Sequence, residues 1–313
     1  MEYRKVGNSG LKVSALSLGA WLSYGHKGTE HDAMATIHHA IELGANFIDV
    51  ADVYAGGRAE TMVGKAIQSI KRSDLVVSTK AFWPMTDNVN DRGLSRKHLF
   101  ESVHASLKRL GTDYVDLFFC HRFDPETPLD ETVRAIDDLI RQGKILYWGT
   151  SCWTADQLDA VFEVVRETGA HRPIVEQPPY NLLDREGVEG ALEAAVERHG
   201  MGLVTFGPLA SGVLTGKYND GIPEGSRATT IHTDWFMAGL AEERIARARQ
   251  FTELAREVGT TPAALAIAWV IRNPHVTSAI TGATRPEQVD QNFAALNVTI
   301  TDELAARLET ISR

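Results

Sequence analysis

Eight short apolar segments recur along the chain, separated by loops and by stretches with the periodicity of amphipathic helices. The segments are apolar on both faces instead of alternating, which is typical of strands buried in a parallel sheet. They are Ala15–Leu18, Asn46–Asp49, Leu75–Thr79, Val115–Phe119, Ile145–Gly149, Ile174–Gln177, Leu203–Phe206 and Ser278–Thr281. Strand and helix repeated eight times close most simply into a (β/α)₈ TIM barrel. An open doubly wound sheet is the alternative, but no Gly-x-Gly-x-x-Gly motif follows any of these strands, which disfavours its dinucleotide-binding form.

Capping signals indicate where several helices begin. We expect helix starts at Thr29, at Ser95, at Thr127 with Pro128 as the first helical residue, and at Thr154. Thr29 and Thr154 are followed three residues later by Asp32 and Gln157, the spacing of a capping box. These starts lie in the gaps between the predicted strands, as the alternating pattern requires.

Two regions and one tail lie outside the eightfold repeat. Gly7–Gly10 is predicted to turn a β-hairpin, which could plug the N-terminal end of the barrel. The connection 208–239 is long and rich in Gly, Pro and Thr, and loops of that length in compact domains are usually functional. Thr301–Arg313 reads as an extra C-terminal helix. With no linker visible, we expect 1–313 to form a single domain.

Composition and charge limit the classes of function that this chain could have. A formal net charge of -9 and the lack of a long Lys/Arg run argue against nucleic-acid binding. No run approaches the length of a membrane span, and the N-terminus lacks a signal-peptide segment, so we expect no membrane partner. The 2 cysteines, Cys120 and Cys152, suggest a reducing compartment and hence a cytoplasmic protein. The histidines lack partners at ligand spacing, so we predict no metal.

Four polar residues lie at or just beyond the C-terminal ends of predicted strands. Asp49 ends one strand and Tyr54 follows in the loop, Lys80 ends the next strand, and His121 ends the third. Neighbouring parallel strands would bring all four to one mouth of the barrel. Asp52, the other carboxylate beside Tyr54, and Arg122 and Asp124, beside His121, are expected to hold their loops in place.

The four side chains together suggest a proton donor. A phenol has an ordinary pKa of about 10, and an ammonium close to Tyr54 would lower that value while Asp49 holds Lys80 in place. His121 could orient a carbonyl oxygen by a hydrogen bond. The implied reaction is carbonyl reduction, for which a nicotinamide cofactor must supply the hydride. Taken singly, each residue is more often structural, and Lys80 is also compatible with the Schiff-base chemistry of a class I aldolase.

These residues resemble the Asp/Tyr/Lys/His tetrad of the aldo-keto reductase superfamily. The resemblance covers nearly the whole chain and is closest to the branch of the potassium-channel β subunits and their bacterial relatives. The segments that carry it, besides the tetrad, are Tyr3–Ser14, Gly93–Lys97, Tyr147–Ser151, Leu209–Tyr218 and Gly282–Gln288. The family implies a barrel enzyme that reduces a small-molecule carbonyl with NADPH, without a Rossmann motif. It includes monomers and homo-oligomers.

The resemblance also implies residues that hold the cofactor. Gln177 and Ser151 would bind the nicotinamide carboxamide, Phe206 would stack on the ring, and Lys217 and Arg227 would meet phosphates. The full expected set is Gly19, Ala20, Trp21, Ser151, Cys152, Gln177, Phe206, Gly207, Pro208, Leu209, Ser211, Gly212, Lys217, Arg227, Gly282, Thr284, Gln288, Gln291 and Asn292. Aromatic residues near the strand ends, expected to contact substrate, are Trp21, Tyr24, Trp83 and Trp153.

Some positions depart from the family pattern. Cys152 stands where the channel β subunits carry Arg, and Gly207 replaces the usual Ser, which weakens the expectation of tight NADPH retention. His121 stands where those subunits carry Asn, which favours a working reductase. A redox-sensing regulatory subunit that binds NADPH and turns over slowly is the alternative function.

Overall fold

The chain folds into a closed barrel of eight parallel strands, as the apolar segments predict. The computed structural model describes residues 1–21, 30–229 and 237–312. Around the barrel the strands follow the order β10-β3-β4-β5-β6-β7-β8-β9, so sequence neighbours pair and β10 closes onto β3. The barrel strands are β3 (Leu16–Gly19), β4 (Phe47–Asp49), β5 (Val76–Ala81), β6 (Val115–Cys120), β7 (Ile145–Ser151), β8 (Val175–Gln177), β9 (Gly202–Phe206) and β10 (Val276–Thr281).

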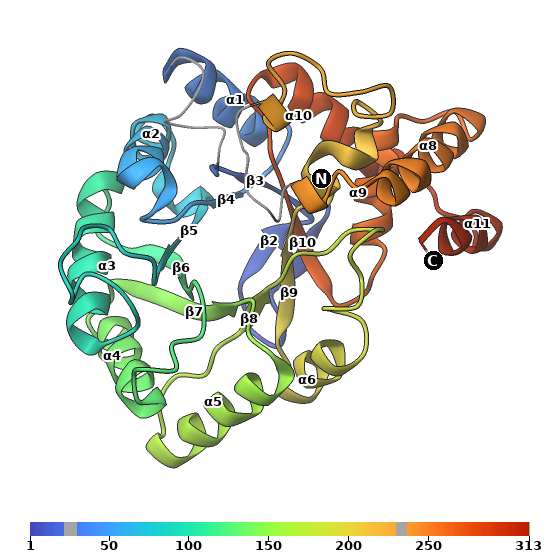
Figure 1. The fold of residues 1–313 in the computed structure, drawn as a ribbon. Coiled ribbons are helices and arrows are strands. Elements are labelled where there is room, and N and C mark those ends of the chain that lie inside the picture. Colours follow the sequence, from blue (N-terminus) through green and yellow to red (C-terminus); the bar gives the residue numbers. More distant parts are fainter. Residues whose placement is uncertain (22–29, 230–236, 313) are drawn as a thin grey trace.

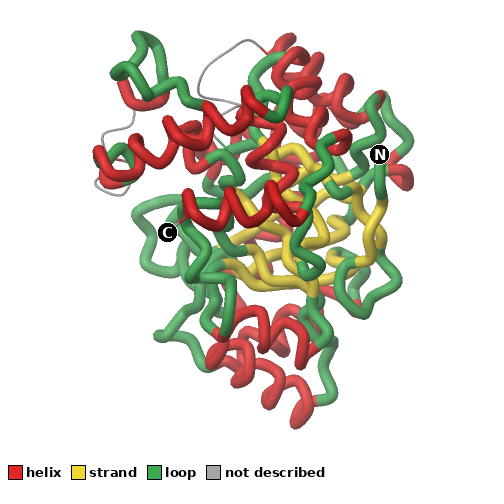
Figure 2. The backbone as a smooth tube through the Cα atoms, turned by 90° about the vertical axis from the view of Figure 1, so that its right-hand side faces the viewer, coloured by secondary structure: helices red, strands yellow, loops and turns green. Residues whose placement is uncertain are grey.

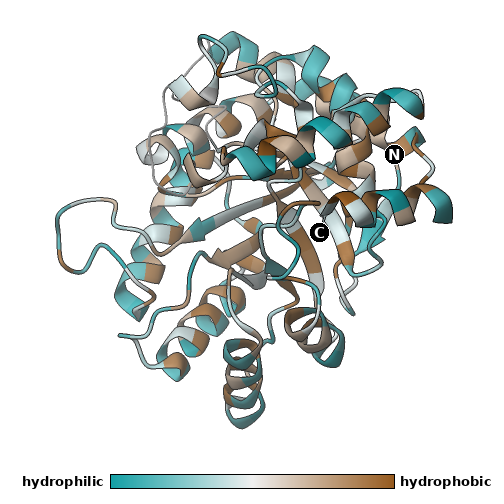
Figure 3. Ribbon diagram, turned by 45° about the vertical axis from the view of Figure 1, so that its right-hand side comes forward, coloured by the Kyte–Doolittle hydropathy of each residue, from teal (hydrophilic) through white to brown (hydrophobic). Residues whose placement is uncertain are grey.

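Helices surround the barrel (Figures 1 and 2). In Figure 3 the strands and the inner helix faces carry much of the apolar colouring, while polar colouring is concentrated on outward-facing parts of the helices. The α-helices are α1 (Glu30–Glu42), α2 (Arg58–Ile67), α3 (Arg96–Leu110), α4 (Leu129–Arg141), α5 (Ala155–Thr168), α6 (Ala191–His199), α8 (Glu242–Glu257), α9 (Pro262–Ile271), α10 (Pro286–Phe293) and α11 (Asp302–Ser312). Short 3-10 helices are η1 (Tyr54–Gly57), η2 (Arg72–Asp74), η3 (Ala210–Thr215), η4 (Arg227–Thr229) and η5 (Ala294–Asn297).

Two predicted helix caps are confirmed and one is wrong. The Ser95 hydroxyl accepts the backbone N–H of His98 in the first turn of α3, and Thr154 forms a reciprocal capping box with Gln157 on α5. Helix α4 does not start at Thr127: Pro128 is its N-cap, because a ψ of 130 keeps that residue outside the helix. The Thr127 hydroxyl instead donates to Asp124 at 2.7 Å. The start expected at Thr29 lies outside the described residues.

The N-terminal hairpin closes the end of the barrel at which the strands begin, here called the lower end. Strands β1 (Tyr3–Lys5) and β2 (Lys12–Ser14) pair antiparallel, as the turn predicts. The Asn8 backbone N–H donates to the carbonyl of Gly200 at 2.8 Å, just before β9 begins. Val6 and Val13 belong to the same buried apolar cluster as residues inside the barrel. The hairpin therefore completes the barrel core from below, and the expected plug is confirmed.

Gly7→Ala tests this plug. A Cβ at Gly7 would lie 2.5 Å from the Gly200 oxygen, and the residue has a φ of +52. We expect the variant to lose about 1–3 kcal/mol of unfolding free energy, the scale of overpacking, measured by urea denaturation. Gly10→Ala is the matched control, because a Cβ there meets nothing within 4 Å. Equal stability of the two variants would show that the hairpin is not tightly docked.

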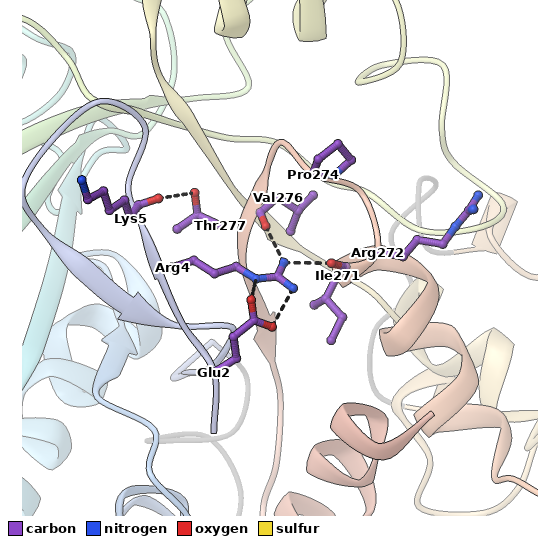
Figure 4. A pocket seen from close by; sticks show the side chains of 8 residues that line it. All are labelled: Glu2, Arg4, Lys5, Ile271, Arg272, Pro274, Val276 and Thr277. Carbon is purple, nitrogen blue, oxygen red and sulfur yellow. Dashed lines mark hydrogen bonds and ion pairs between the residues drawn. The ribbon is translucent and has the colours of Figure 1, made fainter. Parts of the chain in front are cut away.

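A polar pocket lies beside the same hairpin (Figure 4). Arg4 lies across its wall: Nε donates to Glu2 at 2.9 Å, and Nη1 donates to the carbonyls of Ile271 and Val276, each at 2.8 Å. The guanidinium thus ties β1 to the turn between α9 and β10. We interpret this pocket as part of the lower closure of the barrel.

Helix α11 packs outside the barrel against α8, and Arg307 pairs with Glu257 across that contact. The extra C-terminal helix predicted from the sequence is confirmed. Within the described ranges, no single helix is long and apolar enough to cross a membrane. One pair, α8 and α9, passes the length and composition test jointly, but the two helices meet at a bend of 96°.

Candidate active site

The four predicted residues lie at the mouth of the barrel that is formed by the C-terminal ends of the strands, here called the upper mouth. Asp49 is the last residue of β4, Lys80 lies near the end of β5, and His121 follows β6 directly. Tyr54 opens η1, in the loop between β4 and α2. Because β4, β5 and β6 are adjacent and parallel, their C-terminal ends lie side by side.

Lys80 is the centre of the cluster and is fully buried. Its Nζ donates to Asp49 Oδ2 at 2.6 Å and to the Val50 carbonyl at 2.9 Å, and it lies 3.4 Å from the Tyr54 hydroxyl. A buried ammonium is tolerated only when it is paired and hydrogen-bonded, and these contacts meet that need. The expected link from Asp49 through Lys80 to Tyr54 is therefore present as a continuous chain of contacts.

Two further side chains hold the Asp49 carboxylate. Ser78 Oγ donates to Asp49 Oδ1 at 2.7 Å, and Gln177 Nε2 donates to the same oxygen at 3.1 Å. Ser78 was not predicted from the sequence, although it lies two residues before Lys80, so both point to the same face of β5. With both oxygens engaged, the carboxylate has a fixed orientation toward the ammonium.

The loop that carries Tyr54 is held by Asp52 and by backbone geometry. The Asp52 carboxylate accepts the Val53 N–H at 2.6 Å and the Ser102 hydroxyl of α3 at 2.8 Å. The Asp52 N–H donates to the Lys80 carbonyl at 3.2 Å. After Tyr54 the chain turns through left-handed conformations, including Ala55 with a φ of 52. Asp52 therefore has the loop-holding role expected of it.

The electrostatics favour a protonated phenol and a neutral imidazole. Burial raises the pKa of Tyr54 above its ordinary value, and the opposing effect of Lys80 is smaller. The expected net lowering of this pKa is therefore wrong. Burial, followed by the charges of Lys80 and Arg122, holds the pKa of His121 well below 6.5. Tyr54 is thus in the proton-donating form at neutral pH, and the neutral ring of His121 has one N–H to donate.

Aromatic rings form part of the mouth. The Tyr54 ring lies 5.8 Å from the His121 ring, with Trp21 6.4 Å from Tyr54 and Trp83 6.4 Å from His121. Trp21 and Trp83 are 40% and 38% exposed, so both present apolar faces beside the tetrad. The prediction that Trp153 also lines the pocket is not supported by its position. It is 2% exposed, because its ring packs against Phe123 at 5.0 Å. Tyr24 lies outside the described residues.

Comparison with known proteins identifies the family. The model of the Aldo/keto reductase family matches residues 15–313. This chain belongs to the aldo/keto reductase family. Membership implies oxidoreductase activity and agrees with the barrel and with the tetrad-bearing mouth described above.

Several curated members of the family are similar over nearly their whole length. A probable voltage-gated potassium channel subunit beta of Arabidopsis thaliana is 46% identical over 302 residues, covering 95% of this chain and 92% of the relative. A protein of the same description from Oryza sativa subsp. japonica is 44% identical, covering 99% and 96%. A putative subunit beta from Schizosaccharomyces pombe (strain 972 / ATCC 24843) is 42% identical, covering 99% and 93%. The resemblance to the channel β-subunit branch is therefore confirmed.

In this aldo/keto reductase, the cofactor positions implied by the resemblance gather around the same mouth. They follow the C-terminal ends of five strands, β3, β7, β8, β9 and β10, with the outermost positions on the loop to α10 and on α10 itself. Gln177 already donates to Asp49, and Ser151 Oγ donates to the Gln177 carbonyl at 2.9 Å. Gly282 and Asn292 are joined by a hydrogen bond of 3.1 Å. Arg227 lies in η4, but its side chain is outside the description.

The loop after β9 makes a tight left-handed turn beside Lys217. Ala210, Ser211 and Gly212 take positive φ values of 47, 57 and 96 in succession. Hydrogen bonds close this turn internally, from the Ala210 N–H to the Gly207 carbonyl at 2.9 Å and from the Gly212 N–H to the Leu209 carbonyl at 2.8 Å. A Cβ at Gly212 would lie 2.6 Å from Lys217 Nζ, so the ammonium rests against this loop. The ammonium fits the binding of a phosphorylated group.

Asp124 and Arg122, both in the loop between β6 and α4, make different contacts. Asp124 holds the loop as expected, accepting the Leu94 N–H and the Thr127 hydroxyl, each at 2.7 Å. Arg122 donates to the backbone carbonyl of the adjacent His121, and its guanidinium also lies over the Trp83 ring at 5.6 Å. Among the described residues, no group of three or more His, Cys, Asp or Glu side chains could hold a metal ion.

Glu176 is a buried acid behind the mouth that sequence reasoning missed. It accepts the Thr150 hydroxyl and the Trp153 N–H, and burial raises its pKa from 4.5 to about 7. Between those two values the folded protein keeps a proton that the unfolded chain has lost. The free energy of unfolding therefore falls as pH rises through that window.

Glu176→Gln should remove this dependence on pH. The difference in unfolding free energy, variant minus wild type, should increase by about 3 kcal/mol between pH 4.5 and pH 8. Urea denaturation at several pH values measures it. Asp52, whose pKa burial also raises to about 7, keeps its own contribution of the same sign. Glu163→Gln, at an exposed position of α5, is the control. If the unfolding free energy of Glu176→Gln falls with pH as steeply as that of wild type, Glu176 is not the source of this pH dependence.

Proposed function

We propose that this chain is an NADPH-dependent oxidoreductase that reduces aldehydes and ketones to alcohols. The observation that carries the proposal is the chain of contacts at the mouth: Asp49 to Lys80 at 2.6 Å and Lys80 to Tyr54 at 3.4 Å. The ring of His121 lies beside the phenol. Family membership supports the reaction class.

The side chains have complementary roles in this proposal. The Tyr54 hydroxyl gives its proton to the carbonyl oxygen, and the ammonium of Lys80 stabilises the phenolate that forms. The neutral His121 donates a hydrogen bond to the same oxygen and so orients the carbonyl. Asp49, held by Ser78 and Gln177, keeps the ammonium in place. Trp21 and Trp83 present apolar surface to the rest of a small-molecule carbonyl substrate.

The cofactor assignment rests on the residues that ring the mouth. When bound, NADPH supplies the hydride. The Lys217 ammonium, beside the loop Ala210–Gly212, would hold its phosphates, and Ser151 and Gln177 would hold the carboxamide of its nicotinamide. Phe206, at the end of β9, would stack against the ring. We also propose a cytoplasmic setting, in keeping with the two unpaired cysteines.

The direct test is a panel of aldehydes and ketones assayed by NADPH oxidation at neutral pH. We expect multiple turnovers and a preference for NADPH over NADH. Lys217→Ala should raise the KM for NADPH about tenfold or more, because it removes a charge-assisted contact to phosphate. If NADPH does not bind, measured by quenching of tryptophan fluorescence, the proposal fails.

The names of the relatives favour a second candidate, a regulatory subunit that binds NADPH and turns over slowly. The two functions differ in rate. For a sensor, turnover of every carbonyl in the panel would be limited by slow release of NADP⁺ and would stay far below one per minute. Multiple-turnover rates measured beside the rate of NADP⁺ release decide between them, and the histidine at position 121 leads us to expect the faster enzyme.

A further inference from the structure

Arg122 lies at the candidate active site but has no part in the proposed proton transfer. It directly follows His121 at the end of β6. Its guanidinium carbon lies 5.6 Å from the centre of the exposed Trp83 ring, which itself lies 6.4 Å from the His121 ring. Arg122, Trp83 and His121 therefore form one side of the mouth.

The charge of Arg122 is not balanced locally. Within the described part of the chain, its guanidinium donates a hydrogen bond to the carbonyl of His121, and no carboxylate forms an ion pair with it. By contrast, Lys80 is neutralised by Asp49 at 2.6 Å. Because His121 is held neutral, Arg122 contributes a positive charge without an ion-pair partner beside the tetrad, in a protein whose formal net charge is -9.

The nearest acids are already engaged elsewhere. Asp124 accepts hydrogen bonds from Leu94 and Thr127, and it is Arg122's near neighbour in sequence. Glu176 is fully buried and is held by Thr150 and Trp153. Glu176 is within electrostatic range of Arg122, but burial raises its pKa to about 7 and neither acid forms an ion pair with the guanidinium. Several of the guanidinium N–H donors therefore remain free for a ligand.

Arg122 is within electrostatic reach of the reacting groups. Its charge contributes to lowering the pKa of His121, and it acts in the same direction on the pKa of Tyr54. A carbonyl oxygen placed between Tyr54 and His121 would therefore have a guanidinium a short distance away, beside the indole of Trp83. Guanidinium groups bind carboxylates in a planar, two-point geometry that a lone ammonium cannot match.

We propose that Arg122 is an anion subsite of the mouth, and that the preferred substrates are carbonyl compounds carrying a carboxylate a few bonds from the carbonyl carbon. This proposal rests on the proposed reductase function. Arg122 binds the carboxylate, Trp83 covers the connecting apolar part, and Tyr54 with His121 receives the carbonyl oxygen. The low dielectric of a partly buried mouth strengthens the ion pair.

A matched pair of substrates tests the subsite. The pair is 4-formylbenzoate and its methyl ester, which share the aldehyde and the ring and differ in charge. We expect wild type to have the higher kcat/KM for the acid. Arg122→Gln should lower the ratio of acid to ester at least about tenfold, the scale of a lost hydrogen bond to a charged group. Arg134→Gln, which changes net charge equally on the exposed face of α4, should leave the ratio unchanged.

Binding without turnover gives a second readout. In the background Tyr54→Phe, titration of the acid in the presence of NADP⁺ should quench tryptophan fluorescence, and adding Arg122→Gln should weaken that binding about tenfold or more. An unchanged ratio of acid to ester in Arg122→Gln, or equal losses for both substrates, would overturn the subsite. If wild type reduces neither compound with NADPH present, the proposed reductase function fails instead.

Discussion

Tyr54→Phe should lower kcat for carbonyl reduction by at least about two orders of magnitude, the usual scale of general acid catalysis. The variant keeps the ring that packs beside His121 and Trp21 but has no proton to give. Lys80 retains Asp49 and the Val50 carbonyl as partners, so the buried charge stays satisfied. The loss should therefore be confined to chemistry, with little change in stability.

Steady-state assays and cofactor titration separate these effects. NADPH affinity of Tyr54→Phe, measured by fluorescence quenching, should stay within about threefold of wild type, well below the catalytic loss. Tyr114→Phe is the control, because Tyr114 precedes β6 at the opposite end of the barrel and stacks on Arg72. A Tyr54→Phe variant that binds NADPH and turns over at a near-normal rate would refute the mechanism.

Breaking the buried Asp49–Lys80 pair should have the largest effect on stability. Lys80→Met leaves the Asp49 carboxylate without its counter-charge, and such losses cost about 3–5 kcal/mol of unfolding free energy. The same variant should lose activity at least about 100-fold, since Tyr54 loses the cation that stabilises its anion. Urea denaturation and NADPH oxidation measure the two effects independently.

The double variant Asp49→Asn with Lys80→Met separates stability from chemistry. Removing both charges should recover much of the lost stability, because no uncompensated charge remains, while activity stays at the level of Lys80→Met. As a surface comparison, Lys65→Met breaks the exposed pair with Glu30 and should cost less than about 1 kcal/mol. Recovery of activity in the double variant would show that the pair has no catalytic role.

The barrel and the tetrad could be predicted because both depend on local patterns. Segments that are apolar on both faces indicate buried parallel strands, and the ends of such strands lie at one edge. Asp49, Lys80 and His121 each stand at such an end, so their meeting follows from strand order alone. The serine and threonine caps of α3 and α5 are similarly local, since a cap and its partner are three residues apart.

Contacts between distant segments were decided only by the tertiary structure. Gln177 reaches Asp49 across 128 positions of sequence, which no periodicity encodes. Trp153 follows a strand end, as Trp83 does, yet it is buried because Phe123 from the neighbouring loop covers it. Burial likewise sets the direction of the Tyr54 pKa, where the sequence showed only the nearby lysine.

Arg122 illustrates the same difference between what the sequence predicts and what only the tertiary structure decides. The sequence places it next to His121 and so at the mouth, but whether a carboxylate neutralises it depends on how the surrounding loops fold. In the structure Asp124 is held by backbone and hydroxyl groups, and the guanidinium keeps its charge. Strand periodicity and strand order thus determined which chemistry gathers at the mouth. Packing between loops decided which of its charges remain available, because desolvation and pairing depend on neighbours that are distant in the chain.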